Sequence, residues 1–563
     1  MSLIKKLRKR YYFFRKYLND KKFRRYYSEL KEDLKRTRRE IISWASQGKK
    51  GDKGKYFVIL SFTKVPIYAK FHATIGKIAA LNGYKPLILT NRGNYLIYPY
   101  YKWFGIDEIV DWAGYEDQHT DGKEIESVVR GIRPEKFTLE NLISLEYENI
   151  QVGKHTLSMV CRTRLEGQLD FEDSEVQKVL AEFLYKALRS VLAMKKFLAQ
   201  YPVAKMLVRD SGYIPNGGIF ETALTHHVDC VVHEFGQEIG TWVFKRHDLQ
   251  NRNEHYFSLS ASTWEKLKEL PWTSRMQDTL DAEINERYKP NSLSDTRRLQ
   301  HGKKFYTPEA VMDKLGLDSN KKTAVLFSHV PWDATFFYGS CIFGDYERWL
   351  FETVKYLVDH GQNMNWIIKL HPYNAFKLQR EDRDEESEMR LLRSLFPLPA
   401  NIVIMKADTD INTQSLFPII DYVLTVNGTV GMEFPCFGIP SVVAGTGRYD
   451  GRGFSYDNDS IKGYFELLSR LHELPKLTEA QTELARKHYY HLMCRRQTNL
   501  EDIIPMELKK FHEAQSELHN NVNFKPRSLE EFTGTASYQL LSQWFFSSDE
   551  YDVLNPIQEQ TEL

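Results

Sequence analysis

The sequence predicts an α/β protein with two Rossmann-like domains that face a central cleft. The chain has 563 residues, which is enough for two or more domains with ample cores. Short apolar runs rich in β-branched residues alternate with helical patterns in each half, as in doubly wound parallel sheets. The stretch from Asp421 to Ala444 compresses a strand, a short helix and a second strand into one parallel unit.

That stretch also suggests where a ligand binds. Tyr422 to Val426 is predicted as a buried strand, and residues 427–429 interrupt it. Val430 to Phe437 is predicted as a helix that Pro435 makes short or late in starting, and Ser441 to Ala444 as the next strand. Ligands of such sheets bind at the carboxyl ends of strands. We therefore expect the loop at 427–429 to hold the phosphates of a nucleotide-linked ligand.

Composition excludes few function classes. The formal net charge is +2, hydrophobic residues make up 42 % and the mean hydropathy is −0.49, so no general preference for polyanions follows. No apolar run is long enough to span a bilayer, and no apolar segment follows the basic N-terminus as in a signal peptide. The cysteines show no metal-binding spacing, which favours a reduced cytoplasmic compartment; they are Cys161, Cys230, Cys341, Cys436 and Cys494.

Residues 1–46 are predicted as a basic, amphipathic helical region. The first forty residues hold sixteen Lys or Arg against five Asp or Glu. Apolar side chains recur there at helical spacing, at Leu3, Ile4, Leu7, Tyr11, Phe14 and Leu18. Such a helix suits an anionic membrane surface. The alternative is a solvated helix whose apolar stripe packs on the protein body or on another subunit. No nucleic-acid motif supports a third reading.

The first Rossmann-like domain is expected over residues 56–285. Residues 106–170 are polar and read as an insertion that could shape an acceptor site, and 271–307 as irregular. The remaining elements are strands at 56–62, 86–90, 205–209 and 230–233 with helices at 70–82, 174–199 and 219–225.

The second Rossmann-like domain is expected over 321–475, after a connection at 286–320. C-terminal helices and a tail follow over 476–563, and the last forty residues carry no clear pattern. The expected strands are 324–328, 366–370, 402–405, 422–426 and 441–444, and the expected helices are 346–359, 387–395 and 413–417.

Two residues at another strand end strengthen the ligand prediction. Lys369 and His371 belong to the sequence KLHP, which closes the strand at 366–370. Both side chains can bond phosphate oxygens. Each alone is more often structural, but the loop at 427–429 lies near them in an αβ sheet, so we expect them to share one site.

The order KLHP, a strand, and then NGTVGMEF with GIP following resembles a known family. It is similar to the donor half of GT-B glycosyltransferases of bacterial surface polysaccharides, most of all the capsule-biosynthesis group with β-Kdo transferases. Bacterial sialyltransferases and teichoic-acid polyol-phosphate polymerases are more distant. The resemblance covers residues 330–450, and the N-terminal half matches only in general pattern. It implies a GT-B fold and a nucleotide-sugar donor.

The resemblance assigns roles on the donor side. It implies that His371 contacts the nucleotide phosphate or base, and that Asn427, Gly428 and Thr429 bind phosphate. It implies that Glu433 holds the ribose. Gly428 replaces the serine of many relatives, and residues 434–435 replace a usual small residue, so the donor stays open among nucleotide sugars.

Two further loops are expected near the donor. His329 and Asp333 follow the first strand of the second domain and could meet the donor sugar. Arg448 or Arg452, after the last strand, could close over the diphosphate or a carboxylate. The alternatives are a packed interdomain hinge for the first loop and an exposed turn for the second.

The acceptor side is expected on the first domain. An inverting transfer needs a base for the acceptor hydroxyl, and Asp210 follows the strand at 205–209. Tyr213 and Asn216 are expected to line its pocket, with Glu234 as the second choice of base. The alternative is that Asp210 caps the next helix in an ordinary turn.

These patterns lead to one functional hypothesis. The chain is expected to be a metal-independent, cofactor-free GT-B glycosyltransferase that moves a sugar, CMP-linked by preference, to a lipid-linked or growing surface polysaccharide. It would work at the cytoplasmic face of the membrane, attached through residues 1–40, with other polysaccharide-assembly proteins as possible partners and no nucleic acid. The alternatives are a CDP-linked polyol-phosphate transferase and a non-catalytic glycan-assembly scaffold.

Overall fold

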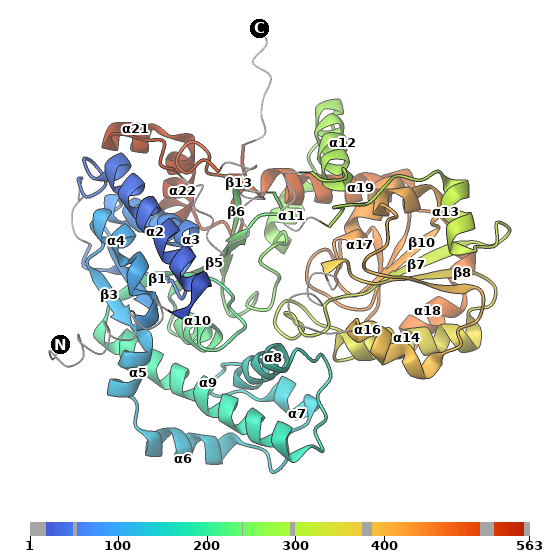
Figure 1. The fold of residues 1–563 in the computed structure, drawn as a ribbon, viewed down its shortest axis with the longest axis horizontal. Coiled ribbons are helices and arrows are strands. Elements are labelled where there is room, and N and C mark those ends of the chain that lie inside the picture. The colour runs from blue at the N-terminus through green and yellow to red at the C-terminus, as the bar shows by residue number, and fades with distance from the viewer. Residues whose placement is uncertain are drawn as a thin grey trace, which may run out of the picture.

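Two α/β domains lie side by side in the computed structural model (Figure 1), which confirms the predicted fold class. The structure describes residues 19–48, 53–238, 240–292, 299–373, 385–506 and 523–556. Each domain is built on one mostly parallel sheet with helices on its faces. The central strands are buried because both faces of the sheet are covered; in Thr323–Phe327, for example, every residue is buried.

The first sheet has the order β13-β6-β5-β4-β1-β2-β3. Its central strands are parallel, while β6 runs antiparallel to both β5 and β13. The four strands predicted for this domain are confirmed, and β3, β6 and β13 were not predicted. The bounds are β1 (Tyr56–Leu60), β2 (Lys85–Thr90), β3 (Glu108–Asp111), β4 (Val203–Val208), β5 (Asp229–Phe235), β6 (Thr241–His247) and β13 (Thr498–Asn499).

The second sheet has the order β12-β11-β10-β7-β8-β9, and all its pairs are parallel. The chain reverses its direction of winding between β8 and β10, on either side of β7, so the carboxyl ends of these strands border a ligand crevice. The five predicted strands are confirmed. The bounds are β7 (Thr323–Phe327), β8 (Asn365–Lys369), β9 (Ile402–Met405), β10 (Tyr422–Thr425), β11 (Ser441–Val443) and β12 (Ser455–Asp457).

Helices cover both sheets. Those up to the second domain are α2 (Lys21–Ile41), α3 (Pro66–Leu81), α4 (Tyr98–Trp103), α5 (Trp112–His119), α6 (Gly122–Ile132), α7 (Leu139–Ser144), α8 (Val152–Arg164), α9 (Ser174–Gln200), α10 (Asn216–Thr225), α11 (Ala261–Leu267), α12 (Ser274–Tyr288) and α13 (Pro308–Leu315). The remainder are α14 (Tyr346–His360), α16 (Ser387–Leu392), α17 (Val430–Glu433), α18 (Ile461–Ser469), α19 (Glu479–Tyr490), α21 (Leu529–Gly534) and α22 (Ala536–Ser547), with short 3₁₀ turns that include η3 (Thr413–Ile419) and η4 (Phe434–Phe437).

The insertion predicted at 106–170 is mostly helical. Helices α5, α6 and α8 pack along α9 below the first sheet (Figure 1), and α7 packs on α8. The insertion also reaches the second domain, because the backbone N–H of Gln168 donates to the Glu347 carboxylate at 2.7 Å. A side chain on Gly167 would collide with Pro331 at 2.8 Å. The insertion therefore contacts the second domain directly, close to the loop after β7.

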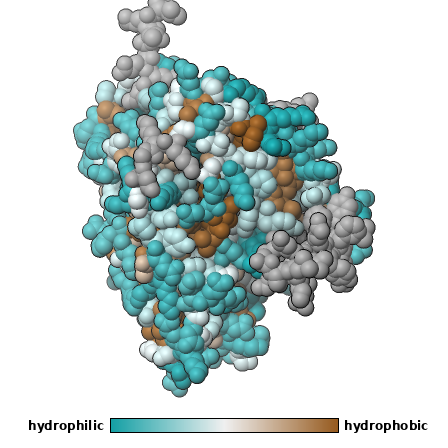
Figure 2. Space-filling model, turned by 90° about the vertical axis from the view of Figure 1, so that its left-hand side faces the viewer, coloured by the Kyte–Doolittle hydropathy of each residue, from teal (hydrophilic) through white to brown (hydrophobic). Residues whose placement is uncertain are grey.

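Helix α2 packs on the first domain through one face. Leu30 and Ile41 are buried, and so is Asp33, which is paired with the fully buried Lys70 at 2.8 Å. The basic side chains of α2 are exposed to solvent. For Lys21–Ile41 the structure therefore shows the predicted alternative, a helix whose apolar stripe packs on the protein body. The face of the molecule that Figure 2 shows is mainly hydrophilic, with separate hydrophobic patches. The earlier apolar positions, Leu3 to Leu18, lie outside the described residues.

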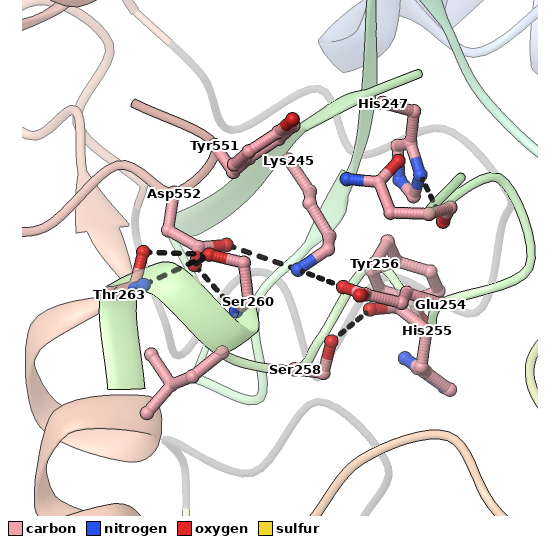
Figure 3. Close-up of polar contacts among 12 residues, drawn as sticks. Lys245, His247, Glu254, His255, Tyr256, Ser258, Ser260, Thr263, Tyr551 and Asp552 are labelled. Carbon is pink, nitrogen blue, oxygen red and sulfur yellow. Dashed lines mark hydrogen bonds and ion pairs between the residues drawn. The ribbon is translucent and has the colours of Figure 1, made fainter. Parts of the chain in front are cut away.

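The C-terminal segment returns to the first domain. The last forty residues carry no clear sequence pattern, and the structure has the helices α21 and α22 there. Beyond them Asp552 is fully buried beside Lys245 of β6 and Arg496, each at 3.3 Å. Figure 3 shows Lys245 between the carboxylates of Asp552 and Glu254, the latter at 3.0 Å. Sequence periodicity could not reveal this, since Asp552 and Lys245 are 307 residues apart in the sequence.

In the ranges that the structure describes, no helix is both long and apolar enough to cross a bilayer. The division of the chain at residues 46, 285, 320 and 475 stays a prediction.

Candidate functional site

Two connected pockets lie between the domains. The small pocket has a volume of about 170 Å³ and is lined mainly by the second domain and by α12. The large pocket has a volume of about 630 Å³ and takes its lining from both domains. Four residues line both: His329, His371, Asn427 and Arg448. Any ligands in the two pockets would therefore meet at this shared wall.

The small pocket is built on the predicted strand–loop–helix unit. Strand β10 ends at Thr425, and α17 begins at Val430. The predicted helix over Val430 to Phe437 is confirmed only in its first turn, because the chain continues as the 3₁₀ turn η4 with Pro435 near its start. Gly438 then takes a left-handed conformation at φ +76° and ends the turn.

The loop at 427–429 is fixed by hydrogen bonds from several directions. The Gly428 N–H donates to the Thr425 hydroxyl at 3.1 Å, and Asn427 donates its side-chain amide to the Tyr346 hydroxyl at 3.2 Å. Tyr449 donates its hydroxyl to the Gly428 carbonyl at 2.8 Å. All three predicted loop residues line the small pocket. Their binding role stays a prediction.

Lys369 and His371 lie at the end of β8, beside that loop. Both line the small pocket, as expected from the strand order. The Lys369 side chain is almost fully buried, and among the described residues its ammonium has no hydrogen bond or ion pair. Burial, followed by the charge of Lys303, lowers the Lys369 pKa well below its usual range. A bound anion would pair with the Lys369 ammonium and so offset the free-energy cost of burying a cation without a partner.

Lys303 adds a second buried cation behind Lys369. Its Nζ atom is enclosed and has no hydrogen-bond partner among the described residues. Burial lowers the Lys303 pKa to about 8. The sequence analysis did not single out Lys303, because it lies in the connection between the domains and outside any motif.

Glu433 lies in the small pocket but is already engaged. Its carboxylate pairs with Arg287 at 3.0 Å and accepts a hydrogen bond from the Tyr288 hydroxyl. Arg287 also donates to the Thr429 hydroxyl at 3.2 Å. Arg287 thus connects the predicted phosphate loop to Glu433, and any ribose contact by Glu433 would be made within this network.

Arg287 and Tyr288 were missed because residues 271–307 were predicted to be irregular. The structure has helix α12 there, so that prediction was wrong. A signal was present, since apolar residues recur at every fourth position, at Met276, Leu280, Ile284 and Tyr288. This stripe is buried against the second domain's helices and gives a helical period within a polar sequence.

Asp210 lines the large pocket in an unusual backbone conformation. It follows β4 at φ +54°, in the left-handed region that non-glycine residues rarely enter. Its carboxylate makes no hydrogen bond or ion pair within the described residues. Backbone strain of this kind occurs often at functional sites. Asp210 therefore faces the large pocket with an available carboxylate, as a general base requires.

Glu234 also lines the large pocket, but its carboxylate is occupied. Arg209 donates to it at 2.7 Å and the Tyr68 hydroxyl at 2.9 Å. Burial raises the Glu234 pKa, which the Arg209 charge partly offsets. Both oxygens are held, so the geometry favours Asp210 over Glu234 as the base.

Tyr213 joins the domains across the large pocket. Its hydroxyl donates to the Asp333 carboxylate at 3.0 Å and accepts from the Ala334 N–H at 3.0 Å. Asp333, predicted on the donor side, thus lines the large pocket and not the small one. Asn216 lines neither pocket, because its side-chain amide donates to the Arg209 carbonyl at 2.6 Å, and its acceptor contact stays a prediction.

The two candidate arginines separate. Arg448 lines both pockets and lies 2.8 Å from the His255 ring nitrogen. Arg452 instead donates to the Leu259 carbonyl at 2.8 Å and supports the connection between the domains. His329 also lies at the shared wall, beside Thr425.

The pockets differ in charge. Arg287, Lys369 and Arg448 face the small pocket, where the one carboxylate, Glu433, is paired. Three carboxylates line the large pocket, together with a group of aromatic rings that includes Tyr213, Tyr256, Phe337, Tyr338, Tyr346 and Tyr373. Within the described ranges, no group of three or more His, Cys, Asp or Glu side chains is placed to hold a metal ion.

Comparisons with known proteins find likeness in structure only. No family model and no curated protein matches the chain. The β-Kdo 2,4 transferase KpsC of Thermosulfurimonas dismutans is 11 % identical, with 53 % of this chain and 85 % of that chain covered and a TM-score of 0.34. UDP-GlcNAc 2-epimerase from Neisseria meningitidis, bound to UDP-GlcNAc, is 10 % identical over 77 % of this chain and 95 % of its own, with a TM-score of 0.25.

The Anabaena protein HepE, in complex with UDP-glucose, is 10 % identical over 77 % of this chain and 93 % of its own, with a TM-score of 0.25. The two sheets themselves define the fold of this chain. Those sheets, with the crevice between them, give this chain the GT-B arrangement of two Rossmann-like domains.

Proposed function

We propose that the protein is a glycosyltransferase that moves a sugar from a nucleotide-sugar donor to a lipid-linked or growing surface glycan. One observation carries the proposal: a small cationic pocket shares a wall with a large pocket that holds the available carboxylate of Asp210. Sugar transfer needs these two features next to each other, one for an anionic leaving group and one for the acceptor's proton.

The donor's phosphate would bind in the small pocket. Arg287, Lys369 and Arg448 supply positive charge there, and His371 lies beside them. Charge-assisted hydrogen bonds of this type are the strong ones, and the buried Lys369 ammonium would gain the anionic partner it lacks. A CMP-linked donor is favoured by the resemblance of the KLHP and NGT motifs, and the reaction would require neither a metal nor a cofactor.

The acceptor would bind in the large pocket. In the transfer, the bond between the sugar's anomeric carbon and the phosphate oxygen breaks, and its electron pair stays with the phosphate. The acceptor oxygen forms the new bond to carbon, and its proton passes to Asp210. The aromatic rings around the pocket would pack against sugar faces, because their apolar surfaces need cover.

The charge of the large pocket favours sugar transfer over polyol-phosphate transfer. A growing polyol-phosphate chain carries a negative charge at each unit, whereas Asp210, Glu234 and Asp333 line the pocket. Like charges disfavour binding of such an acceptor.

Nucleotide release separates these activities. Purified protein with a glycan acceptor is given CMP-, UDP- and GDP-sugars and a CDP-linked polyol, and the freed nucleotide is measured. Acceptor-dependent release of CMP, UDP or GDP from a sugar donor is expected. Release of CMP from the CDP-polyol alone would establish a polyol-phosphate transferase. If no nucleotide is released from any donor, a non-catalytic scaffold is favoured.

We further propose that the protein is peripheral to the inner face of the cell membrane. The outward face of α2 carries exposed basic residues, among them Lys31, Lys35 and Arg39. Because Asp33 ties α2 to the buried Lys70, deletion of the helix would damage the fold. The triple variant K31E, K35E and R39E is the better test. It should sediment less with anionic vesicles than the wild type, and equal sedimentation would exclude α2 as the contact.

A further inference from the structure

His329 has an unusual position at the shared wall of the two pockets. It lines both of them, together with His371, Asn427 and Arg448. It follows β7, one residue beyond Ser328, and so lies at the carboxyl edge of the second sheet. A group at this place can contact the donor where the donor meets the acceptor.

Hydrogen bonds fix which ring nitrogen of His329 carries a proton. The Val426 backbone N–H donates to Nε2 at 3.1 Å, and an N–H cannot accept. The Thr425 hydroxyl lies 3.1 Å from the same nitrogen and itself accepts the Gly428 N–H, which leaves its proton free for Nε2. Nε2 is therefore an acceptor. In a neutral imidazole the proton must then be on Nδ1.

The surroundings keep the ring neutral and still. It stacks on Tyr346 with ring centroids 4.6 Å apart and 27° between planes, and Trp349 lies at 5.7 Å. Burial, followed by the positive charge of Arg448, lowers the His329 pKa to about 3. The Arg448 charge would repel an imidazolium, and His371 and Asp333 are the other titratable groups that line the large pocket with His329 and Tyr346.

The remaining donor, Nδ1–H, has no partner. Within the described residues no hydrogen bond reaches Nδ1, although the ring is otherwise held on every side. A partly buried donor that is fixed in direction and left unpaired costs free energy unless a ligand satisfies it. The position of the ring at the shared wall identifies what that ligand would be.

We propose that His329 is a catalytic hydrogen-bond donor that directs its Nδ1–H at an oxygen of the donor's leaving phosphate. The inference rests on the proposed function and adds a role and a tautomer. His329 transfers no proton in the reaction: it stabilises the charge that grows on the phosphate as the sugar–oxygen bond breaks, while the acceptor's proton goes to Asp210. A fixed donor of this kind needs no reorganisation during reaction.

The tautomer is tested without any substrate. Long-range ¹H–¹⁵N correlation of the ¹⁵N-histidine-labelled protein, with H329N used to assign the signal, should show a protonated Nδ1 and an unprotonated Nε2. The pattern should not change from pH 8 down to about 5, since the ring stays neutral. A protonated Nε2, or a titration of this residue near its ordinary pKa, would overturn the inference whether or not the protein is a transferase.

The role is tested with two isosteric variants. In H329N the amide nitrogen occupies nearly the place of Nδ1, whereas in H329Q it occupies nearly that of Nε2. H329N should retain most of the kcat, within about tenfold, and H329Q should lose about 10²-fold or more, the usual effect of removing one such donor. H360N, at the exposed end of α14, is the matched control and should behave as wild type.

Equal losses in H329N and H329Q, or a greater loss in H329N, would refute the donor role. If the wild type releases no nucleotide from any donor, the proposed function fails first, and the phosphate role assigned here fails with it. The tautomer measured by resonance separates the two failures, because it depends only on Val426 and Thr425.

Discussion

The two pockets share one wall but are built in opposite ways. The small pocket comes from strand ends of the second sheet and from α12, and its charge is positive. The large pocket draws on both domains, is about four times larger, and is lined by carboxylates and aromatic rings. Under the proposed function, the small pocket would hold the anionic leaving group and the large pocket the glycan acceptor. One cleft thus holds two electrostatic environments, each suited to one side of a transfer.

The pockets also differ in their support. The loop at 427–429 is held largely by neighbours in the second domain, such as Thr425 at the end of β10 and Tyr346 of α14. The large pocket depends on contacts between domains, such as Tyr213 with Asp333, and on the loop that carries His255 and Tyr256. That loop adjoins the buried ion network of the C-terminal segment in Figure 3. Substitutions in the C-terminal segment should therefore disturb the structure of the large pocket more than that of the small pocket.

Asp210→Asn gives the largest expected change in rate and tests the large pocket alone. Loss of the base should lower kcat by about 10²–10⁴-fold, while nucleotide affinity, a property of the small pocket, should stay within twofold of wild type by calorimetry, or about 0.4 kcal/mol. Glu234→Gln is the control, because Arg209 and Tyr68 occupy that carboxylate. A greater loss in Glu234→Gln would reverse the assignment of the base.

Asp552→Asn tests the support of the large pocket. It leaves Lys245 and Arg496 buried with less opposing charge, and breaking a buried pair in this way costs about 3–5 kcal/mol of stability. Urea unfolding measures the loss, and Asp549→Asn, an exposed neighbour, should be neutral. A change below about 0.5 kcal/mol, the range of ordinary surface substitutions, would show that the network does not hold the segment.

Lys369→Met tests the small pocket alone. Removal of one charge-assisted hydrogen bond should weaken nucleotide binding by about 1.5–3 kcal/mol, with the exposed Lys355→Met as control. Burial, followed by the charge of Lys303, lowers the pKa of Lys369, so the ammonium that would pair with an anion is lost as pH rises. Affinity of the wild type should therefore fall as pH rises, whereas that of Lys369→Met should change less, and the same profile in both proteins would contradict a role of Lys369 in binding.

Glu283→Gln concerns the layer behind the small pocket and should change only how stability depends on pH. Burial raises the pKa of Glu283 from 4.5 to about 7, and Tyr489 donates to this carboxylate at 2.5 Å. Between pH 4.5 and 7, Glu283 is protonated in the folded protein and ionised in the unfolded chain. The contribution of Glu283 to the free energy of unfolding therefore falls as pH rises through this range. The slope is at most about 1.4 kcal/mol per pH unit.

The variant should flatten this part of the curve of unfolding free energy against pH. An unchanged slope in Glu283→Gln would show that another group is responsible.

The sequence predicted the small pocket better than the large one. Lys369, His371 and the loop at 427–429 follow buried strands, and parallel topology alone brings such positions to one edge. Asp210 and Glu234 were found by the same rule on the first sheet. The rule gives positions and not hydrogen bonds, so it could not tell that Glu234 is occupied or that Asn216 turns back to Arg209.

Other parts lay beyond a local pattern. Arg287 reaches the site from α12, whose apolar residues recur only once per turn within a polar stretch. The antiparallel strand β6 and the C-terminal segment are defined by partners far away in sequence, such as Lys245 with Asp552. Local periodicity carries no information on such pairs, because their stability arises only when both segments meet.

The central claim is that the small pocket binds a nucleotide through its buried cation. A thermal-shift series with CMP, CDP, UDP and GDP tests it most directly, since a ligand of the folded state raises Tm by mass action. We predict that one nucleotide family raises the Tm of the wild type and of Asp210→Asn equally, and that of Lys369→Met far less. No shift with any nucleotide, or an equal shift in Lys369→Met, would contradict the account.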